Sequence, residues 1–423
     1  MKIKNFLLKK RNNLSTSFCL ESETNVLRDH IPIHTLKEND KKKVFYSYNL
    51  VDGYKYKIIV KKEKYNLKNY KFIISSLDHP YIIKLIHCSE YASSFISVFE
   101  FFSDINLYSS ITFSAKYDEK KIKNIIHQII LIIHYLHSNN LVHKQLLPHS
   151  FLIKSVHNDM MIKLEDIHKI KTQPTTINSK TRNQNIYSIG LIMYFLVCRQ
   201  YPIFYIENKE RKLFFSEECW KNISLKGRNF VQKILLSDIS SIISMRDMLD
   251  HDWFKENVKQ NIFINFDMLR SIYNFWKKNA FKRYILNNIS KFIVKEDIYK
   301  YNSLFFYFDI MEEGSIKYSQ YFATMKKLGL IDSNIEESFN GLDISKSGQI
   351  QFSNIIACLL NGFIKIDKRM VLKFFKKVDY DNEGIITKKK LYKFYNMKIK
   401  NDIVSNNKRK FTFEEFFTYI STE

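Results

Sequence analysis

Three short loops, each beginning with an aspartate, recur at nearly constant spacing in the last third of the chain. They begin at Asp309, Asp343 and Asp379, so their starts lie 34 and 36 residues apart. Each has a glycine at its sixth position and an isoleucine at its eighth, namely Gly314, Gly348, Gly384, Ile316, Ile350 and Ile386. Self-similarity at this period indicates a repeated supersecondary unit. We therefore expect this part of the chain to be all-helical, with short loops between the helices.

The loops resemble the calcium-binding loops of EF-hand proteins, in which position eight lies in a short strand that pairs neighbouring loops. Calcium needs six to eight oxygen ligands, and a bidentate glutamate at position twelve closes the site. That position holds Gln320, Asn354 and Lys390 in these three loops. A fourth copy around "FTFEEFFTYI" would place Glu415 at position twelve, with Val404 replacing its first aspartate. Every copy is therefore incomplete as a calcium site.

The acidic residues that remain in the loops are the metal ligands that this resemblance implies. They are Asp309, Asp343, Asp379, Asp381 and Glu383. The third loop has the richest cluster, so we expect at most one weak calcium site, in that loop. Lys390 would place an ammonium group there, where an anion belongs. The alternative is a helical tail that apolar packing holds in one state.

The first part of the chain follows a different pattern. Residues 44–62 alternate aromatic, β-branched and lysine residues around an Asp-Gly turn, which predicts two or three strands. Residues 119–138 and 185–197 predict two long apolar helices, and shorter helices follow. An α+β unit therefore precedes the all-helical one.

Six segments of this unit occur in the order typical of a Ser/Thr protein kinase. They are "LDHPYIIKLI", "FISVFEFF", "IIHQIILIIHYLHSNNLVHKQLLPHSFLI", "IKLEDIH", "NIYSIGLIMYFLVCRQYPI" and "SMRDMLDHDWF". With the repeats, they resemble the calcium-dependent protein kinases that have a calmodulin-like tail. The resemblance implies an α+β fold class, with a bilobal protein-kinase-like fold followed by an all-α EF-hand domain. We divide the chain into a disordered basic extension (1–38), a degenerate kinase-like domain (39–254), a junction helix (255–297) and a degenerate calmodulin-like domain (298–423).

The nucleotide-binding features of this family are reduced. The Gly-rich loop should lie within residues 39–56, which contain only Gly53, so backbone amides cannot fold over the phosphates. The strand "IIVKK" implies that Lys61 is the phosphate-contacting lysine, or else an ordinary strand lysine. Tyr70 stands where the family has the glutamate that pairs with this lysine. Asp166 in "LEDIH" matches the magnesium-binding aspartate, and would hold Mg²⁺ through bound ATP or be an ordinary loop aspartate.

The catalytic loop, "LVHKQLLPHS", lacks the polar groups of the family at three positions. His143 matches the histidine of the family, but Gln145 stands at the position of the general base. A neutral amide cannot accept the substrate proton, and a positioned base contributes about 10²- to 10⁴-fold. Leu147 replaces a lysine that neutralises the moving phosphoryl group, and Ser150 replaces an asparagine that holds a second Mg²⁺. The resemblance therefore implies a loop that keeps its shape without its chemistry.

The segment between the two units resembles the junction that docks on the calmodulin-like domain in this family. One predicted helical stripe of this segment contains Leu269, Tyr273, Trp276, Ala280 and Tyr284. Lysines and an arginine beside the stripe give the helix a basic character, as in helices that bind a groove. We expect intramolecular docking of this helix on the EF-hand domain, either reversible or permanent.

The overall composition limits the partners and the compartment of the protein. The formal charge of +24 comes from 67 basic and 43 acidic residues, and the lysines are spread through nearly every segment. This spread argues against a specific nucleic-acid site. Five separated cysteines indicate a reducing compartment. No secretory signal or transmembrane segment is apparent, and Lys2 replaces the glycine that N-myristoylation needs, so we expect a cytoplasmic protein.

Three functions remain open on these grounds. The first is a catalytically impaired kinase-like protein, not an enzyme, that acts on a protein partner such as an active kinase, as scaffold or allosteric regulator. The second is an ATP- and Mg²⁺-binding protein kinase with residual activity, regulated by calcium. The third is a calcium-responsive adaptor that uses the EF-hand domain.

Overall fold

The computed structural model describes most of the 423 residues. The described residues are 27, 29–62, 67–91, 94–113, 116–156, 159–173, 180–238, 242–255, 265–294, 296–330, 334–387, 389–391 and 410–422. Residues 1–26 and residues 404–409, which form the first half of the predicted fourth loop and include Val404, lie outside them. None of the helices in the described ranges combines the length and the apolar character that a bilayer crossing requires.

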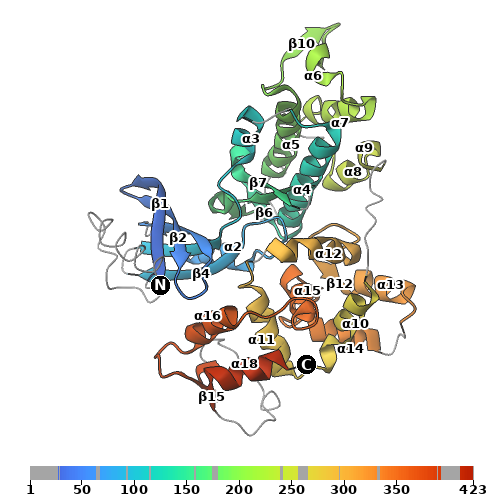
Figure 1. The fold of residues 1–423 in the computed structure, drawn as a ribbon. Helices are drawn as coiled ribbons and strands as arrows, with labels where there is room; N and C mark the ends of the chain where they lie inside the picture. Colours follow the sequence, from blue (N-terminus) through green and yellow to red (C-terminus); the bar gives the residue numbers. More distant parts are fainter. Residues whose placement is uncertain are drawn as a thin grey trace.

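The chain begins with a small lobe built on one five-stranded antiparallel sheet, of order β1-β2-β3-β5-β4 (Figure 1). Its elements are β1 (His30–Asn39), β2 (Lys42–Asn49), β3 (Lys55–Lys61), α2 (Leu67–Ser76), β4 (Leu85–Tyr91) and β5 (Ser94–Glu100). We predicted that residues 30–38 belong to a disordered extension. This prediction is wrong, because these residues form most of the strand β1. Its outer half is polar and exposed, which an edge strand tolerates, while His30 and Ile31 anchor its buried end.

A larger lobe follows, and its centre is the helix α4. Its elements are α3 (Leu107–Phe113), α4 (Glu119–Ser138), β6 (Leu141–His143), η1 (Pro148–Ser150), β7 (Phe151–Val156), β8 (Asp159–Leu164), η2 (Ile167–Lys169), β9 (Ile170–Thr172), α5 (Lys180–Cys198), β10 (Phe204–Glu207), β11 (Glu210–Leu213), α6 (Glu217–Trp220), α7 (Leu225–Leu235), α8 (Met245–Leu249) and α9 (Asp252–Lys255). Asp118 caps α4, and a run of isoleucines buries most of its surface. The helix predicted at residues 119–138 is confirmed, and Gln128 fixes it to β8 by donating to the Met160 carbonyl.

The helical tail contains short strands between its helices. Its elements are α10 (Phe266–Asn274), η3 (Phe275–Lys277), α11 (Ala280–Ser290), η4 (Glu296–Tyr301), α12 (Asn302–Phe308), β12 (Ile316–Lys317), α13 (Tyr318–Lys327), α14 (Ile335–Leu342), β13 (Gln349–Ile350), α15 (Phe352–Leu359), α16 (Lys368–Val378), β14 (Ile385–Thr387), β15 (Lys410–Thr412) and α18 (Phe413–Ser421). As predicted for position eight, Ile316 pairs with Ile350. Ile386 pairs with Phe411, which is position eight of the fourth copy.

The single junction helix that we predicted is interrupted. The chain leaves the helix at Lys278, and the Asn279 side chain caps α11 by accepting from the Phe281 amide at 2.8 Å. This break resets the helical phase, so the predicted stripe is not one buried face. Leu269 is buried and Ala280 is exposed, for example. A capping asparagine overrides the apolar periodicity here.

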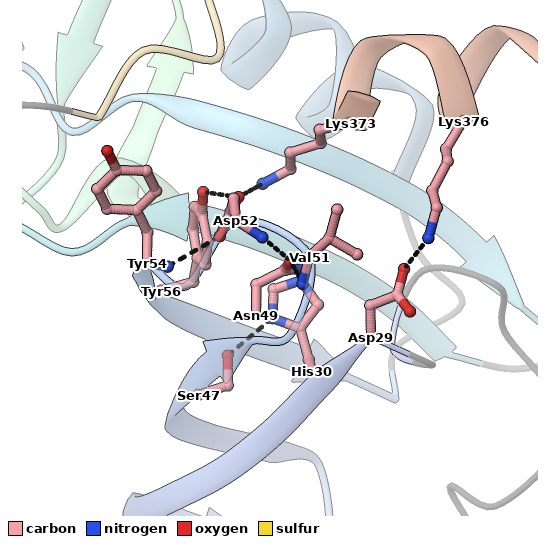
Figure 2. Close-up of polar contacts among 10 residues, drawn as sticks. All are labelled: Asp29, His30, Ser47, Asn49, Val51, Asp52, Tyr54, Tyr56, Lys373 and Lys376. Atoms are coloured by element: carbon pink, nitrogen blue, oxygen red, sulfur yellow. Dashed lines mark hydrogen bonds and ion pairs between the residues drawn. The ribbon is translucent and has the colours of Figure 1, made fainter. Parts of the chain in front are cut away.

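The tail lies against the small lobe, and a buried ion pair joins them (Figure 2). Asp52, in the turn between β2 and β3, is 2% exposed and accepts from Lys373 of α16 at 3.1 Å. It also accepts from the Tyr56 hydroxyl at 2.6 Å. Nearby, Lys376 and Asp29 form a more exposed pair at 3.5 Å. These contacts hold α16 against the turn and the strand β3.

Further contacts join the tail to the segment between α2 and β4 and to the large lobe. The Ser353 amide in α15 donates to Asp78, 3.3 Å away, in the segment that links α2 to β4. Lys84 donates to the Ser290 carbonyl at the end of α11 at 3.2 Å. In the first loop, a Cβ added to Gly314 would lie 2.5 Å from Tyr135 of α4. The tail therefore packs on both lobes.

Replacement of Asp52 by asparagine should destabilise the folded protein by up to about 3–5 kcal/mol, because Lys373, whose side chain is 16% exposed, would lose the buried carboxylate that balances its charge. Burial already lowers the pKa of Lys373, so this charge depends on the Asp52 carboxylate. Urea denaturation of the full chain measures the change.

The exposed pair provides the matched control for this prediction. Asp29→Asn should change stability by less than about 1 kcal/mol, since Lys376 remains hydrated. Equal effects of the two variants would show that the Asp52 pair does not hold the tail.

Candidate functional site

Two lysines of β3 lie on the same face of the strand, because side chains alternate along it. Lys57 forms an ion pair with Glu165, which follows β8 and precedes Asp166. The ammonium group of Lys61 lies 4.5 Å from the ring centroid of Tyr70 on α2. A cation–π contact thus stands where the family has a lysine–glutamate pair. The sequence resemblance indicated Lys61 for the phosphate contact, whereas Lys57 is the lysine that reaches the segment of Glu165 and Asp166.

A third lysine adds to the positive charge in this region. Lys42 of β2 stands opposite Lys61 in the strand ladder. Burial, together with repulsion by Lys61 and Lys57, lowers the pKa of Lys42 to about 8, while Asp166 opposes the change. The small lobe therefore presents a cluster of lysines toward Asp166, and an anionic group would relieve their repulsion.

A histidine and a lysine of the chain itself contact the two oxygens of Asp166. Its Oδ1 lies 2.9 Å from Nδ1 of His168, and its Oδ2 lies 2.8 Å from Nζ of Lys169. Burial alone would raise the pKa of Asp166, but the hydrogen bonds from His168 and Lys169 outweigh it and lower that pKa. The carboxylate is ionised, as a magnesium ligand must be, but Lys169 and His168 already occupy its oxygens.

Gln145, which stands at the position of the general base in the catalytic loop, also contacts Lys169. Lys169 also donates to Oε1 of Gln145 at 3.2 Å, and Gln145 itself is exposed. Ser150 is buried, and its hydroxyl accepts from the Leu147 amide at 3.3 Å. The degenerate positions Gln145, Leu147 and Ser150 thus lie in one loop. Their polar groups are the Gln145 amide and the Ser150 hydroxyl, which is hydrogen-bonded within the loop. None of these groups is a strong base or a carboxylate.

The backbone of this loop is held by residues with structural roles. His143 is buried, and its Nε2 lies 3.1 Å from the Asp166 carbonyl oxygen. Burial lowers the pKa of His143 to about 4, so it is neutral. Asn185 of α5 donates to the His143 carbonyl at 2.6 Å and accepts from its amide at 3.1 Å. This role of Asn185 was not predicted from the sequence, where its position at the start of the apolar part of α5 was the available signal.

The third loop of the tail has an ammonium group at its centre (Lys390). Its Nζ lies 2.6 Å from Asp379 and 3.0 Å from Glu383, and it also pairs with Asp381. The Ile385 carbonyl accepts from the same group at 2.9 Å. Burial opposes charge on Lys390, but these partners outweigh burial and raise its pKa. The three residues that we predicted as calcium ligands thus converge, as a calcium site requires, around a lysine of the chain.

In the first two loops, the leading aspartates bind backbone amides. Asp309 is fully buried and accepts from the Gly314 amide at 2.7 Å, and burial raises its pKa to about 7. Asp343 accepts from the Gly348 amide at 2.6 Å. At position twelve, Gln320 accepts from the Lys317 amide at 2.9 Å. These loops keep their turns through hydrogen bonds within the chain.

Asparagine at position twelve of the second loop also serves the packing of the tail. Asn354 accepts from the Gln351 amide at 2.7 Å and donates to Asn287 of α11 at 3.0 Å. A residue that would bind calcium in a complete loop here joins α15 to the junction segment. Among the described residues, no group of three or more histidines, cysteines or carboxylates is arranged to hold a metal ion.

Comparison with known proteins agrees with this architecture. Residues 52–174 match the family of the protein kinase domain. Calcium-dependent protein kinase 3 of Plasmodium berghei is 23% identical over 365 residues, which are 78% of this chain and 66% of that protein. Calcium-dependent protein kinase 21 of Arabidopsis thaliana is 25% identical over 403 residues, or 86% of this chain and 75% of that protein. Calcium-dependent protein kinase 5 of Plasmodium falciparum is 26% identical over 371 residues, or 80% and 65%.

The chain therefore has a bilobal, kinase-like fold followed by a helical domain. The plant and Plasmodium proteins to which it is similar are calcium-dependent protein kinases. It spans about two thirds of the length of the Plasmodium relatives.

Replacement of Lys390 by glutamate should create a calcium site in the third loop. The change removes the internal cation and supplies the carboxylate that closes a loop with Asp379, Asp381 and Glu383. We expect calorimetry on the full chain to detect calcium binding with a dissociation constant of roughly 10⁻⁵ to 10⁻⁴ M. The unmodified chain should bind far more weakly in this loop.

Two variants separate the roles of the lysine and the added carboxylate. Lys390→Gln removes the cation alone, and Asn354→Glu adds a carboxylate to the second loop, which has Asp343 as its acidic ligand. Both should bind more weakly than Lys390→Glu. Equal calcium affinity of the unmodified chain and Lys390→Glu would contradict the prediction.

Proposed function

We propose that this chain is a catalytically impaired relative of calcium-dependent protein kinases that acts through a protein partner. It would serve as a scaffold or as an allosteric regulator of an active kinase. The observation that carries the proposal is the Lys169 ammonium, which contacts both the Asp166 carboxylate and Gln145. Phosphotransfer needs a metal-binding carboxylate and benefits from a base at the attacking hydroxyl. In this chain Lys169 contacts the carboxylate of Asp166, and the neutral amide of Gln145 stands at the position of the base.

The packing of the molecule supports a role that depends on shape. The loop backbone is kept by Asn185, and the tail is fixed to the small lobe by Asp52 and Lys373. In the third loop, Lys390 stands among the carboxylates, so the tail does not need calcium to close this loop. A rigid, two-part surface of this kind suits protein recognition, because little of it must be ordered on binding.

A second function is favoured by one observation and stays open beside the first. Lys42, Lys57 and Lys61 crowd the side of the small lobe that faces Asp166, and their repulsion lowers the pKa of Lys42. The phosphates of ATP would relieve this repulsion, and the match to the protein kinase domain covers the same region. In this alternative the chain binds ATP and Mg²⁺ and has residual phosphotransferase activity.

Thermal unfolding with ATP and Mg²⁺ distinguishes the two functions. We expect no rise in the melting temperature of the unmodified chain at millimolar nucleotide, since Lys169 competes with Mg²⁺ for Asp166. A ligand at 100 times its dissociation constant would stabilise the fold by about 2.7 kcal/mol, which is readily measured. Phosphorylation of a peptide by the purified chain, lost in Asp166→Ala, would establish the second function instead.

Release of Asp166 should restore nucleotide binding in part. Lys169→Gln removes the competing ammonium, so we expect a melting-temperature shift with ATP and Mg²⁺ that the unmodified chain lacks. Lys171→Gln, two residues along and exposed, is the matched control and should show no shift. A shift in neither variant would mean that Lys169 is not what limits metal binding.

The partner is tested with the full chain. Addition of the purified chain should change the activity of a kinase that copurifies with it from cells. The absence of any such kinase, together with a nucleotide shift in the unmodified chain, would favour the second function.

A further inference from the structure

The tail contains a cavity of about 950 Å³ between α10, the connection to α11, the end of α15, and the C-terminal elements β15 and α18. This volume lies in the range of sites for small-molecule ligands, about 300–1,000 Å³. The cavity is separate from the Asp166 region and from the first three loops, which contribute none of its lining residues. Its lining combines cations, amides and aromatic rings.

The cations of this cavity outnumber its carboxylates. Arg270, Lys277, Lys278 and Lys282 line it, and Asp267 is the acidic residue among the lining residues. Within the residues that the structure describes, Arg270, Lys277 and Lys278 form no ion pair with a carboxylate. The lysines near Asp166 and in the third loop behave differently, since Lys169 and Lys390 are paired. The cavity therefore has a positive potential that the described residues do not neutralise.

The position of α11 adds to this potential. The helix begins at Ala280, after its capping residue Asn279, and both Asn279 and Phe281 line the cavity. The partial positive charge at a helix N-terminus favours anions, and it acts here beside Lys277 and Lys278. Amide groups of Asn274 and Asn361 also line the cavity and can donate hydrogen bonds.

A rigid aromatic wall closes the other side. The rings of Phe281 and Phe411 lie 6.5 Å apart, and those of Phe411 and Tyr419 lie 5.8 Å apart. Lys282 lies 5.7 Å from the Tyr419 ring and donates to the Thr422 carbonyl, so its buried side chain is held in place. Such a preformed wall lowers the cost of ordering side chains when a ligand binds.

We propose that this cavity binds a small, multiply phosphorylated molecule. Several phosphate groups would contact Arg270, Lys277 and Lys278 together, because charge-assisted hydrogen bonds to phosphate are the strong ones. A single phosphate would leave most of the volume unfilled. The ring carrying the phosphates would lie against the aromatic wall. The site is independent of phosphotransfer and of the partner proposed above, so each can fail without the other.

Calorimetry with inositol hexakisphosphate on the full chain at about 0.15 M salt tests the site, since this salt screens loose surface attraction. We expect one molecule to bind, with micromolar affinity. Lys277→Gln with Lys278→Gln should weaken binding at least about tenfold, because two phosphate contacts are lost. The matched control is Lys120→Gln with Lys121→Gln, an exposed pair of adjacent lysines on α4, which should change affinity less than about twofold.

Three results would overturn the proposal. The first is the absence of binding by the unmodified chain. The second is equal weakening by both lysine pairs, which would show general attraction to a basic protein. The third is displacement of the ligand by a decaglutamate peptide at lower concentration than the ligand itself, which would assign the cavity to an acidic protein segment.

The source of the phosphates is decided by a second arm. Sedimentation with vesicles of phosphatidylcholine, with and without 5% phosphatidylinositol 4,5-bisphosphate, compares a lipid headgroup with the soluble molecule. Binding to inositol hexakisphosphate without vesicle binding supports the proposal as stated. Vesicle binding that is lost in the Lys277–Lys278 variant, without soluble binding, would overturn it in favour of a lipid headgroup.

Discussion

Lysine side chains of this protein stand beside the carboxylates that would otherwise hold metal ions. Lys169 contacts Asp166, and Lys390 lies among the three carboxylates of the third loop. A buried ion pair adds little net stability by itself, since desolvation of both charges cancels most of the attraction. Loss of one partner is costly, however, at about 3–5 kcal/mol, because the other charge remains buried. This cost applies to Lys390, which is buried beside Asp379, whereas the pair of Lys169 with Asp166 is partly exposed and costs less to break.

This arrangement changes how the chain would respond to a divalent cation. The ammonium group of Lys390 is part of the loop, so its effective concentration at the carboxylates is far above that of a free ion. Calcium would have to displace this group. The loop also lacks the glutamate ligand at position twelve, where Lys390 stands. The same competition holds at Asp166, where Lys169 would have to move before Mg²⁺ could bind. The two lysines thus hold these carboxylates in one arrangement at any concentration of divalent cation.

The sequence predicted those features that depend on local pattern. The helix at residues 119–138, the strand pairing of Ile316 with Ile350, and the ammonium of Lys390 in the third loop follow from periodicity and position. Features that depend on tertiary contact were not predicted. The strand β1 is polar along its outer half and is defined by pairing with β2. Lys57 and Lys169 are two of many lysines, and only the fold shows which ones reach Glu165 and Asp166.

The helix α16 links the third loop to the small lobe. Its last turn leads to Asp379, which Lys390 holds, and Lys373 in the same helix pairs with the buried Asp52. A calcium-driven change in the loop would have to reorient α16 and break this pair. Because Asp52 is buried, the break would cost more than an exposed pair such as Asp29 with Lys376. Lys373 therefore holds the middle of α16, and Lys390 holds the aspartate that follows its C-terminal end.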